Sequence, residues 1–137
     1  MPKRKKQSVL KGQIIIESGV HVWSHELFIA SALSNAGYTV RFIPEHGSSH
    51  SADAYLNNTI FEFKAPEGST IKAVERNLVR ALSQSSNIVI STVRMKKIQD
   101  RSVQSFLASR LHDGRGIKRL LFVTRDGRVI DINELIR

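Results

Sequence analysis

Two acidic residues and a lysine lie in a short stretch of the chain that alternates like a pair of β-strands. Asp53 belongs to the run ADAYL, and Glu62 and Lys64 belong to the run TIFEFK. The runs are separated by Asn57 and Asn58. Because asparagine tolerates the left-handed backbone conformation, this pair predicts a two-residue hairpin turn. The spacing therefore predicts a hairpin with a carboxylate on each of its strands.

The register of this hairpin decides what the two carboxylates can do. With a two-residue turn, Asp53 pairs directly with Glu62, and their side chains lie about 5 Å apart on one face. Strand alternation adds Lys64 to that face and turns Phe61 and Phe63 toward the core. Two carboxylates so placed repel each other, whereas a divalent cation would use them as ligands. A slip of one residue would turn one carboxylate to the core side.

A cation held by Asp53 and Glu62 beside Lys64 is suited to phosphodiester hydrolysis. A bound metal acidifies a water molecule and neutralises charge on the scissile phosphate. A lysine can position that water and stabilise the anionic transition state. The alternative is a pair of surface carboxylates neutralised by Lys64 and other basic neighbours, because an Asp followed by Glu-x-Lys also arises by chance in basic chains.

Glu26 is a further candidate, near the start of a helix expected over 24–36. Ser24 is the expected N-cap of that helix. Leu27 and Ala30 are expected to face the core, so that Glu26 can face the sheet edge where the hairpin opens. The alternative is an acidic residue that only stabilises the helix N-terminus.

Three basic residues are spaced at helical intervals in a second expected helix, over 71–84. Lys72, Arg76 and Arg80 lie at i, i+4 and i+8 and form one cationic ridge. Such a ridge can bind nucleic-acid phosphates, or it can be a solvated face with Glu75 as a local partner. Other basic residues fall near the ends of expected elements and could line a groove: Arg94, Lys96, Lys97, Arg101, Lys118 and Arg119.

The remaining elements are predicted from periodicity and turn residues. Strands are expected over 13–16, 38–43, 52–56, 59–64, 87–92, 118–123 and 128–132, and helices over 24–36, 71–84, 98–111 and a short C-terminal tail. This interleaving predicts an α/β sandwich with a mixed sheet. The helix over 71–84 is expected to cross over between parallel neighbours.

Composition limits the class of protein. The 137 residues indicate one domain, and the lack of cysteine excludes disulfides and thiolate metal sites. The net charge is +9, of which +5 lies in residues 1–12. We interpret residues 1–12 as a flexible basic tail, either a solvated leader or a nucleic-acid-binding arm, and 13–137 as a single domain. No apolar stretch is long enough for a membrane span or a signal-peptide core.

Taken together, Glu26, Asp53 and the run Glu62-Phe63-Lys64 resemble the PD-(D/E)XK nuclease pattern, with Ala52 in place of the usual proline. The runs SADAYLNNTIFEFKAPEGST and VERNLVRALSQSSNIVI are more narrowly similar to the C-terminal nuclease toxins of contact-dependent growth inhibition systems. The similarity extends over roughly residues 24–92.

This resemblance implies a restriction-endonuclease-like fold, a mixed β-sheet flanked by helices. It implies that Asp53 and Glu62 bind Mg²⁺ or Mn²⁺, that Lys64 is catalytic and that Glu26 supports the site. It also implies a tRNA-cleaving toxin that is secreted or delivered to act in the cytoplasm. A cognate immunity protein would be expected to be acidic, because the toxin is basic.

The choice of tRNA depends on the resemblance alone, and two alternatives stay open. One is a DNA endonuclease of the same superfamily, since the same site can hydrolyse either backbone. The other is a non-catalytic nucleic-acid-binding module.

Overall fold

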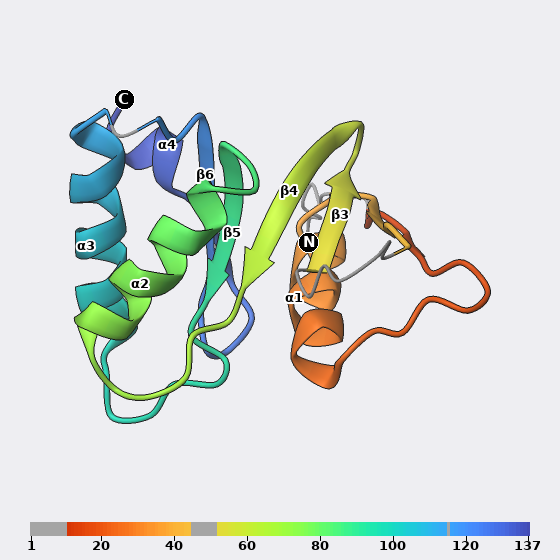
Figure 1. Cartoon of the computed structure of the whole chain (residues 1–137), viewed down its shortest axis with the longest axis horizontal. Coiled ribbons are helices and arrows are strands. Elements are labelled where there is room, and N and C mark those ends of the chain that lie inside the picture. The colour runs from red at the N-terminus through yellow and green to blue at the C-terminus, as the bar shows by residue number, and fades with distance from the viewer. Residues whose placement is uncertain (1–10, 45–51, 115) are drawn as a thin grey trace, which may run out of the picture.

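A computed structural model describes residues 11–44, 52–114 and 116–137, with the backbone alone at 52 and 53. The described residues form a mixed seven-stranded sheet with helices on both sides (Figure 1). The strands are β1 (Ile14–Ile15), β2 (Val40–Phe42), β3 (Ala52–Leu56), β4 (Thr59–Lys64), β5 (Asn87–Ser91), β6 (Arg119–Val123) and β7 (Val129–Asp131). The helices are α1 (Ser24–Asn35), α2 (Ile71–Leu82), α3 (Asp100–His112) and α4 (Ile132–Leu135).

The strands are ordered in the sheet as they are in the chain, from β1 to β7. β2, β3 and β4 pair antiparallel, whereas β4, β5 and β6 pair parallel. The expected crossover is confirmed, because α2 connects the parallel strands β4 and β5. The expected mixed α/β sheet is confirmed as well.

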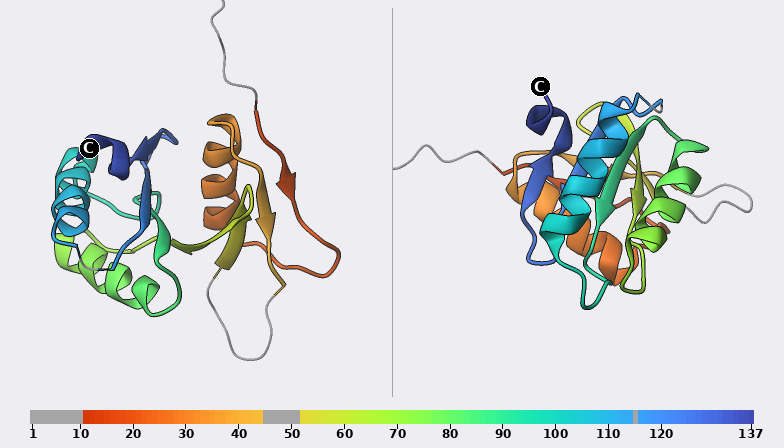
Figure 2. Two further views of the ribbon diagram at one scale, coloured as in Figure 1. Left: turned by 90° about the horizontal axis from the view of Figure 1, so that it is seen from above. Right: turned by 90° about the vertical axis from the view of Figure 1, so that its left-hand side faces the viewer.

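The sheet curls around α1, which lies on its inner side, while α2 and α3 lie on its outer side beside β5 and β6 (Figure 2). Each side has its own core. The inner core joins Ile29 and Leu33 of α1 to Phe61, Phe63, Val89 and Leu121 of the sheet. The outer core joins Val74 and Leu78 of α2 and Val103 and Leu107 of α3 to Ile88, Ile90, Leu120 and Phe122. Strand alternation explains the division, since neighbouring residues of β5 and β6 belong to opposite cores.

Helix α1 differs from the expectation at its first turn. Trp23 is the N-cap, not Ser24, and its backbone N–H donates a hydrogen bond of 2.9 Å to Oε1 of Glu26. The expectation that Leu27 faces the core is wrong, since 43% of its surface is exposed. The buried stripe is centred on Glu26, Ile29 and Leu33 instead, because the curled sheet surrounds that side of the helix.

The basic tail expected over residues 1–12 lies almost wholly outside the described residues. In the part of the chain that the structure describes, no helix is long and apolar enough to cross a membrane.

Candidate functional site

The hairpin of β3 and β4 has the expected register. Leu56 pairs with Thr59 around a turn of two residues, and Asn57 adopts a positive φ of 56°. Asp53 therefore pairs with Glu62 across the strands. Cross-strand partners share a face of the sheet, so the backbone places these two acidic residues together. The structure describes only the backbone of Asp53, and its side chain lies outside the description.

Glu62 is a charged residue in a place that normally holds an apolar one. Its exposed fraction is 0%, and on the other side it pairs in register with Ile88 of β5. Nζ of Lys64 lies 3.4 Å from Oε2 of Glu62, and the lysine side chain is 20% exposed. Burying a carboxylate is costly unless other groups compensate for the lost hydration. A buried acid beside a lysine at the sheet surface is therefore a candidate for function.

Glu26 reaches this region from the other side of the sheet. It is 8% exposed in the first turn of α1, which lies against the inner face, whereas Glu62 and Lys64 lie on the outer face. The first turn of α1 and the carboxyl ends of β4 and β5 lie at the same end of the molecule (Figure 1). The described contacts of Glu26 include its bond to the backbone of Trp23, and a supporting catalytic role stays a prediction.

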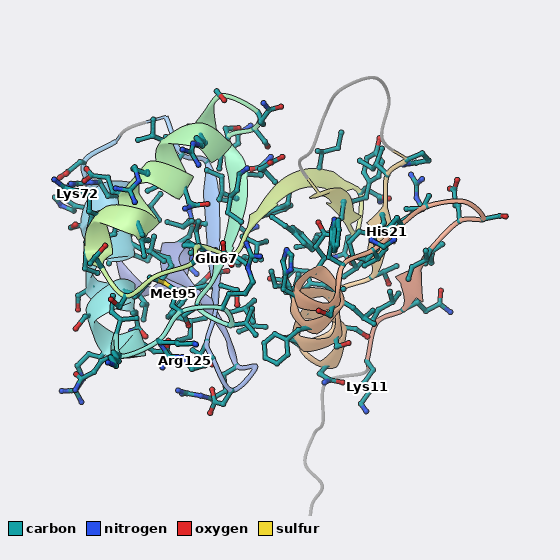
Figure 3. The ribbon with its side chains drawn as sticks, turned by 60° about the horizontal axis from the view of Figure 1, so that its bottom comes forward. Lys11, His21, Glu67, Lys72, Met95 and Arg125 are labelled. Carbon is teal, nitrogen blue, oxygen red and sulfur yellow. The ribbon has the colours of Figure 1, made fainter. Side chains whose placement is uncertain are left out.

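A group of charged residues that the sequence did not single out surrounds the carboxyl ends of β4 and β5. The guanidinium of Arg94 donates hydrogen bonds of 3.1 and 2.9 Å to the carbonyl of Ala65, and it lies 3.6 Å from the carboxylate of Glu67. Figure 3 shows Glu67 at this end of the molecule. Partial burial and the positive charge of Arg94 lower the pKa of His25, while Glu67 acts in the opposite direction. The sequence suggested Arg94 only as one basic residue among several.

Asp100 joins the ends of the neighbouring strands. Its carboxylate accepts hydrogen bonds from the Thr92 hydroxyl and from the backbone N–H of Arg125. The Arg125 guanidinium in turn donates to the carbonyls of Met95 and Ile98, 3.1 and 2.8 Å away. Figure 3 labels Arg125 and Met95. These bonds hold the loops after β5 and β6 in place. A sequence signal existed, since Thr92 directly follows a buried strand.

The cationic ridge on α2 has the expected exposure. Lys72, Arg76 and Arg80 are all exposed, and together with Glu75 and Val79 they line an open hollow of about 440 Å³. The ion pair of Glu75 is made with Arg110 of α3, at 2.9 Å, and not within the ridge. The ridge is therefore a solvent-facing cationic surface.

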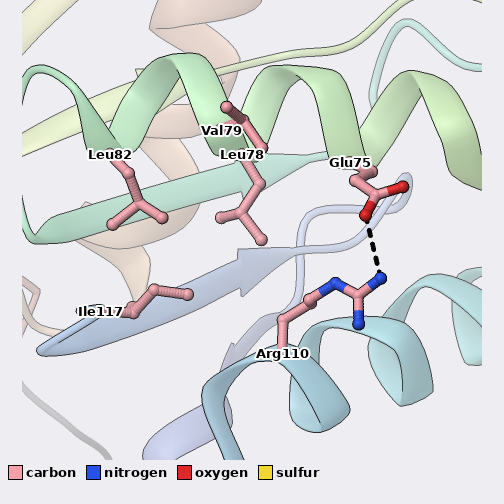
Figure 4. Close-up of a pocket in the computed structure, with 6 residues that line it drawn as sticks. All are labelled: Glu75, Leu78, Val79, Leu82, Arg110 and Ile117. Atoms are coloured by element: carbon pink, nitrogen blue, oxygen red, sulfur yellow. Dashed lines mark hydrogen bonds and ion pairs between the residues drawn. The ribbon is translucent and has the colours of Figure 1, made fainter. Parts of the chain in front are cut away.

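A second hollow, of about 260 Å³, lies between α2 and α3 (Figure 4). It has an apolar lining of Leu78, Val79, Leu82 and Ile117, and the Glu75–Arg110 pair lies beside it. No acid or nucleophile other than Glu75 lines this hollow, so it does not resemble a catalytic site.

The donor groups can be compared with the needs of a metal ion. Among the described side chains, which exclude that of Asp53, no three metal-binding groups come together. A site made from Asp53 and Glu62 would have two carboxylates. Such a donor set suits Mg²⁺, which retains several waters and needs only one or two protein carboxylates. It does not suit a structural zinc site, which needs four protein ligands.

Comparisons with known proteins place the chain in a family. The family model for the contact-dependent growth inhibition CdiA C-terminal domain matches residues 50–129, which is more than half of the chain and includes the hairpin and α2. Among solved structures, a chain of the "CdiA-CT/CdiI toxin and immunity complex from Burkholderia pseudomallei" has a similar fold, with a TM-score of 0.62 and 19% identity. The match covers 88% of this chain and 98% of that one. No curated protein matches in sequence. On the strength of the family match, this protein belongs to the CdiA C-terminal domains of contact-dependent growth inhibition.

Proposed function

We propose that the protein is a metal-dependent ribonuclease toxin with tRNA as its substrate. The observation that carries the proposal is the buried carboxylate of Glu62, which lies opposite Asp53 in register and beside the ammonium of Lys64. Two acidic residues paired in register on one face, with a lysine ammonium beside them, are a donor set suited to metal-assisted phosphodiester cleavage.

The residues of the hairpin divide the chemistry between them. Asp53 and Glu62 would hold Mg²⁺ or Mn²⁺, which would supply an acidified water and a counter-charge for the phosphate. Lys64 lies at the partly exposed end of β4, where its ammonium can interact with a phosphate oxygen and stabilise the negative charge of the transition state. Glu26 would support the site from α1.

The cationic ridge of Lys72, Arg76 and Arg80 would hold the nucleic acid by its phosphates. All three side chains are exposed on the helix that crosses over from β4, the strand of Glu62 and Lys64. Contacts of this kind release counterions and are independent of base sequence. Replacement of Arg76 and Arg80 by alanine is expected to weaken RNA binding and to flatten its salt dependence. Arg128→Ala, at another exposed arginine, is the matched control.

The biological setting follows from the family. The solved structure with a similar fold is a toxin and immunity complex, as its name states. By analogy, we propose that this domain is delivered to the cytoplasm of a target cell and is neutralised by an immunity protein. With a net charge of +9, the domain would attract an acidic partner.

A cleavage assay tests the nuclease proposal. Total RNA and plasmid DNA are incubated with wild type, Asp53→Ala and Glu62→Gln, each with magnesium and with chelator. Glu134→Gln, which removes an exposed carboxylate from α4, is the matched control, and circular dichroism verifies folding. We expect intact tRNA to be lost selectively when magnesium is present, and only with the wild type and the Glu134→Gln control.

Each of the other outcomes contradicts a different part of the nuclease proposal. Cleavage that persists in chelator contradicts the metal assignment. Attack on plasmid alone indicates a DNA endonuclease of the same superfamily. If nothing is cut, and Asp53→Ala binds RNA as well as wild type does, the protein is a nucleic-acid-binding module.

A further inference from the structure

A cation–π pair lies on the same hairpin as the two carboxylates. The guanidinium carbon of Arg41 is 4.4 Å from the centre of the Tyr55 ring. Arg41 and Tyr55 are cross-strand partners of β2 and β3, and Tyr55 pairs on its other side with Ile60 of β4. Ile60 is 41% exposed and the Arg41 side chain is 42% exposed. The three residues form a continuous strip across three strands, which we term the Arg41–Tyr55–Ile60 strip.

The strip shares a face of the sheet with the candidate catalytic residues. Ala54 and Phe61, the neighbours of Tyr55 and Ile60 in sequence, belong to the inner core. The strip therefore lies on the outer face, as do Glu62 and its partner position 53. Tyr55 is two residues from Asp53, which is about 7 Å along an extended strand.

The described helices leave this part of the outer face uncovered. α2 and α3 lie outside β5 and β6, and none of the helices formed by residues 11–44, 52–114 and 116–137 lies outside β2 and β3 (Figure 2). Elsewhere on the outer face the sheet presents buried residues such as Ile88 and Phe122 to the helices. The strip is therefore a half-exposed planar and apolar surface beside a buried carboxylate, in a protein with strong positive charge.

We propose that the Arg41–Tyr55–Ile60 strip is a subsite for an unpaired nucleobase next to the cleaved phosphate. Bases of single-stranded RNA stack on aromatic rings and on guanidinium planes, and the strip offers both with an aliphatic side chain at its edge. Arg41 adds positive charge for the adjoining backbone, although Glu17 lies 3.5 Å from it and balances part of that charge. The proposal depends on the nuclease function above and refines it.

A consequence for substrate choice follows. A base can stack on the strip only when it has left its own helix, and extrusion from a duplex costs a few kcal/mol. The enzyme should therefore favour loops and single strands over duplexes. This preference arises from the fold alone and needs no recognition of a particular base.

The test is a binding experiment in the Glu62→Gln background, so that binding is measured without cleavage. The probe is a 12-nucleotide single-stranded RNA with one 2-aminopurine, whose fluorescence falls on stacking, and the same RNA in a duplex. The variants are Tyr55→Leu, Tyr55→Phe and Arg41→Gln. Arg128→Gln is the matched control, because Arg128 is also an ion-paired arginine, with its carboxylate partner at 3.4 Å.

We expect Tyr55→Leu to raise the Kd for the single strand about tenfold and to abolish the quenching, because stacking on one aromatic ring is lost. Tyr55→Phe should retain the single-strand Kd and the quenching of the wild type. The Kd for the duplex should hardly change in either Tyr55 variant. Arg41→Gln should raise the Kd for the single strand more than the Kd for the duplex. With otherwise wild-type protein, Tyr55→Leu should raise KM for cleavage more than it lowers kcat.

Two results overturn the proposal. One is an unchanged single-strand Kd for Tyr55→Leu and Arg41→Gln, which would point to protein docking on this face. The other is an equal loss for single strand and duplex, which would show a charge effect alone. If a thermal melt shows that the Tyr55→Leu variant is not folded, the Kd of the Arg41→Gln variant tests the proposal instead, because the Arg41 side chain is 42% exposed. Failure of the nuclease proposal can be distinguished from both results, because the wild-type protein would then cleave no RNA.

Discussion

The two halves of the outer sheet face differ although one sheet forms both. Over β5 and β6 the face is apolar and fully buried, with Ile88, Ile90 and Phe122 beneath α2 and α3. Over β2 and β3 the same face has Arg41 and Tyr55, which no described helix covers. β4 lies at the border, and there Glu62 is as buried as the isoleucines while Lys64 extends toward solvent.

This difference shows how a fold can bury a carboxylate at the edge of a covered sheet face. The crossover helix α2 covers β4 and β5, so Glu62 is fully buried. Lys64, two residues further along the same face, is partly exposed. A low-dielectric environment strengthens the interactions of Glu62 with nearby charges. A site of this kind requires one half of the face to be covered and the other half to be open.

The largest expected effect tests the covered half. Leu107→Ala, at a residue with 0% exposure in α3, should reduce the free energy of unfolding by about 2–5 kcal/mol because it leaves a cavity. Ile60→Ala, in the open half, should cost about 0.5 kcal/mol or less. Urea unfolding followed by circular dichroism measures both. Equal losses of unfolding free energy would show that both halves of the outer face are covered, which would contradict the difference between them.

The next effect concerns the border residue. Glu62→Gln should lower RNA cleavage at least about 100-fold, because a carboxylate proposed to hold the catalytic metal is lost. Magnesium should raise the Tm of the wild type but not that of the variant, since binding to the folded state stabilises it. A variant with normal cleavage would show that this carboxylate only completes the packing.

A smaller effect tests the helix that forms the cover. The Thr70 hydroxyl is the N-cap of α2 and accepts a hydrogen bond of 3.2 Å from the backbone N–H of Ala73. Thr70→Ala should cost about 1 kcal/mol of unfolding free energy, and Thr70→Ser should restore most of it. If Thr70→Ala is neutral in urea unfolding, packing on the sheet fixes the start of α2 without the cap.

The smallest effect is a pH dependence at the start of α1. The pKa of His25 is lowered in the folded protein by partial burial and by Arg94. The unfolded chain therefore binds the proton more readily, so stability present above about pH 6.5 should decrease as the pH falls through the folded-state pKa. His25→Gln should make the Tm between pH 5 and 8 less dependent on pH. An unaltered pH profile would contradict the closeness of α1 to Arg94.

The hairpin was predictable from sequence because its information is local. Two asparagines fixed the turn, alternation fixed the faces, and together they gave the pairing of Asp53 with Glu62 that the backbone shows. The first turn of α1 was less predictable, since Leu27 and Ile29 are equally apolar and only the curl of the sheet decides which is buried. Arg94 and His25 approach each other from distant segments, so no spacing could have joined them.

By itself the sequence determined the order and type of the elements, the register of β3 and β4, and the candidate residues Asp53, Glu62 and Lys64, because each depends on neighbours in the chain. The tertiary structure decided that Glu62 is wholly buried, that Glu26 lies on the opposite side of the sheet, and that no described helix covers the face around Tyr55. These properties depend on where α1 and α2 pack against the curled sheet, and a curl is the sum of many long-range contacts that no local pattern encodes.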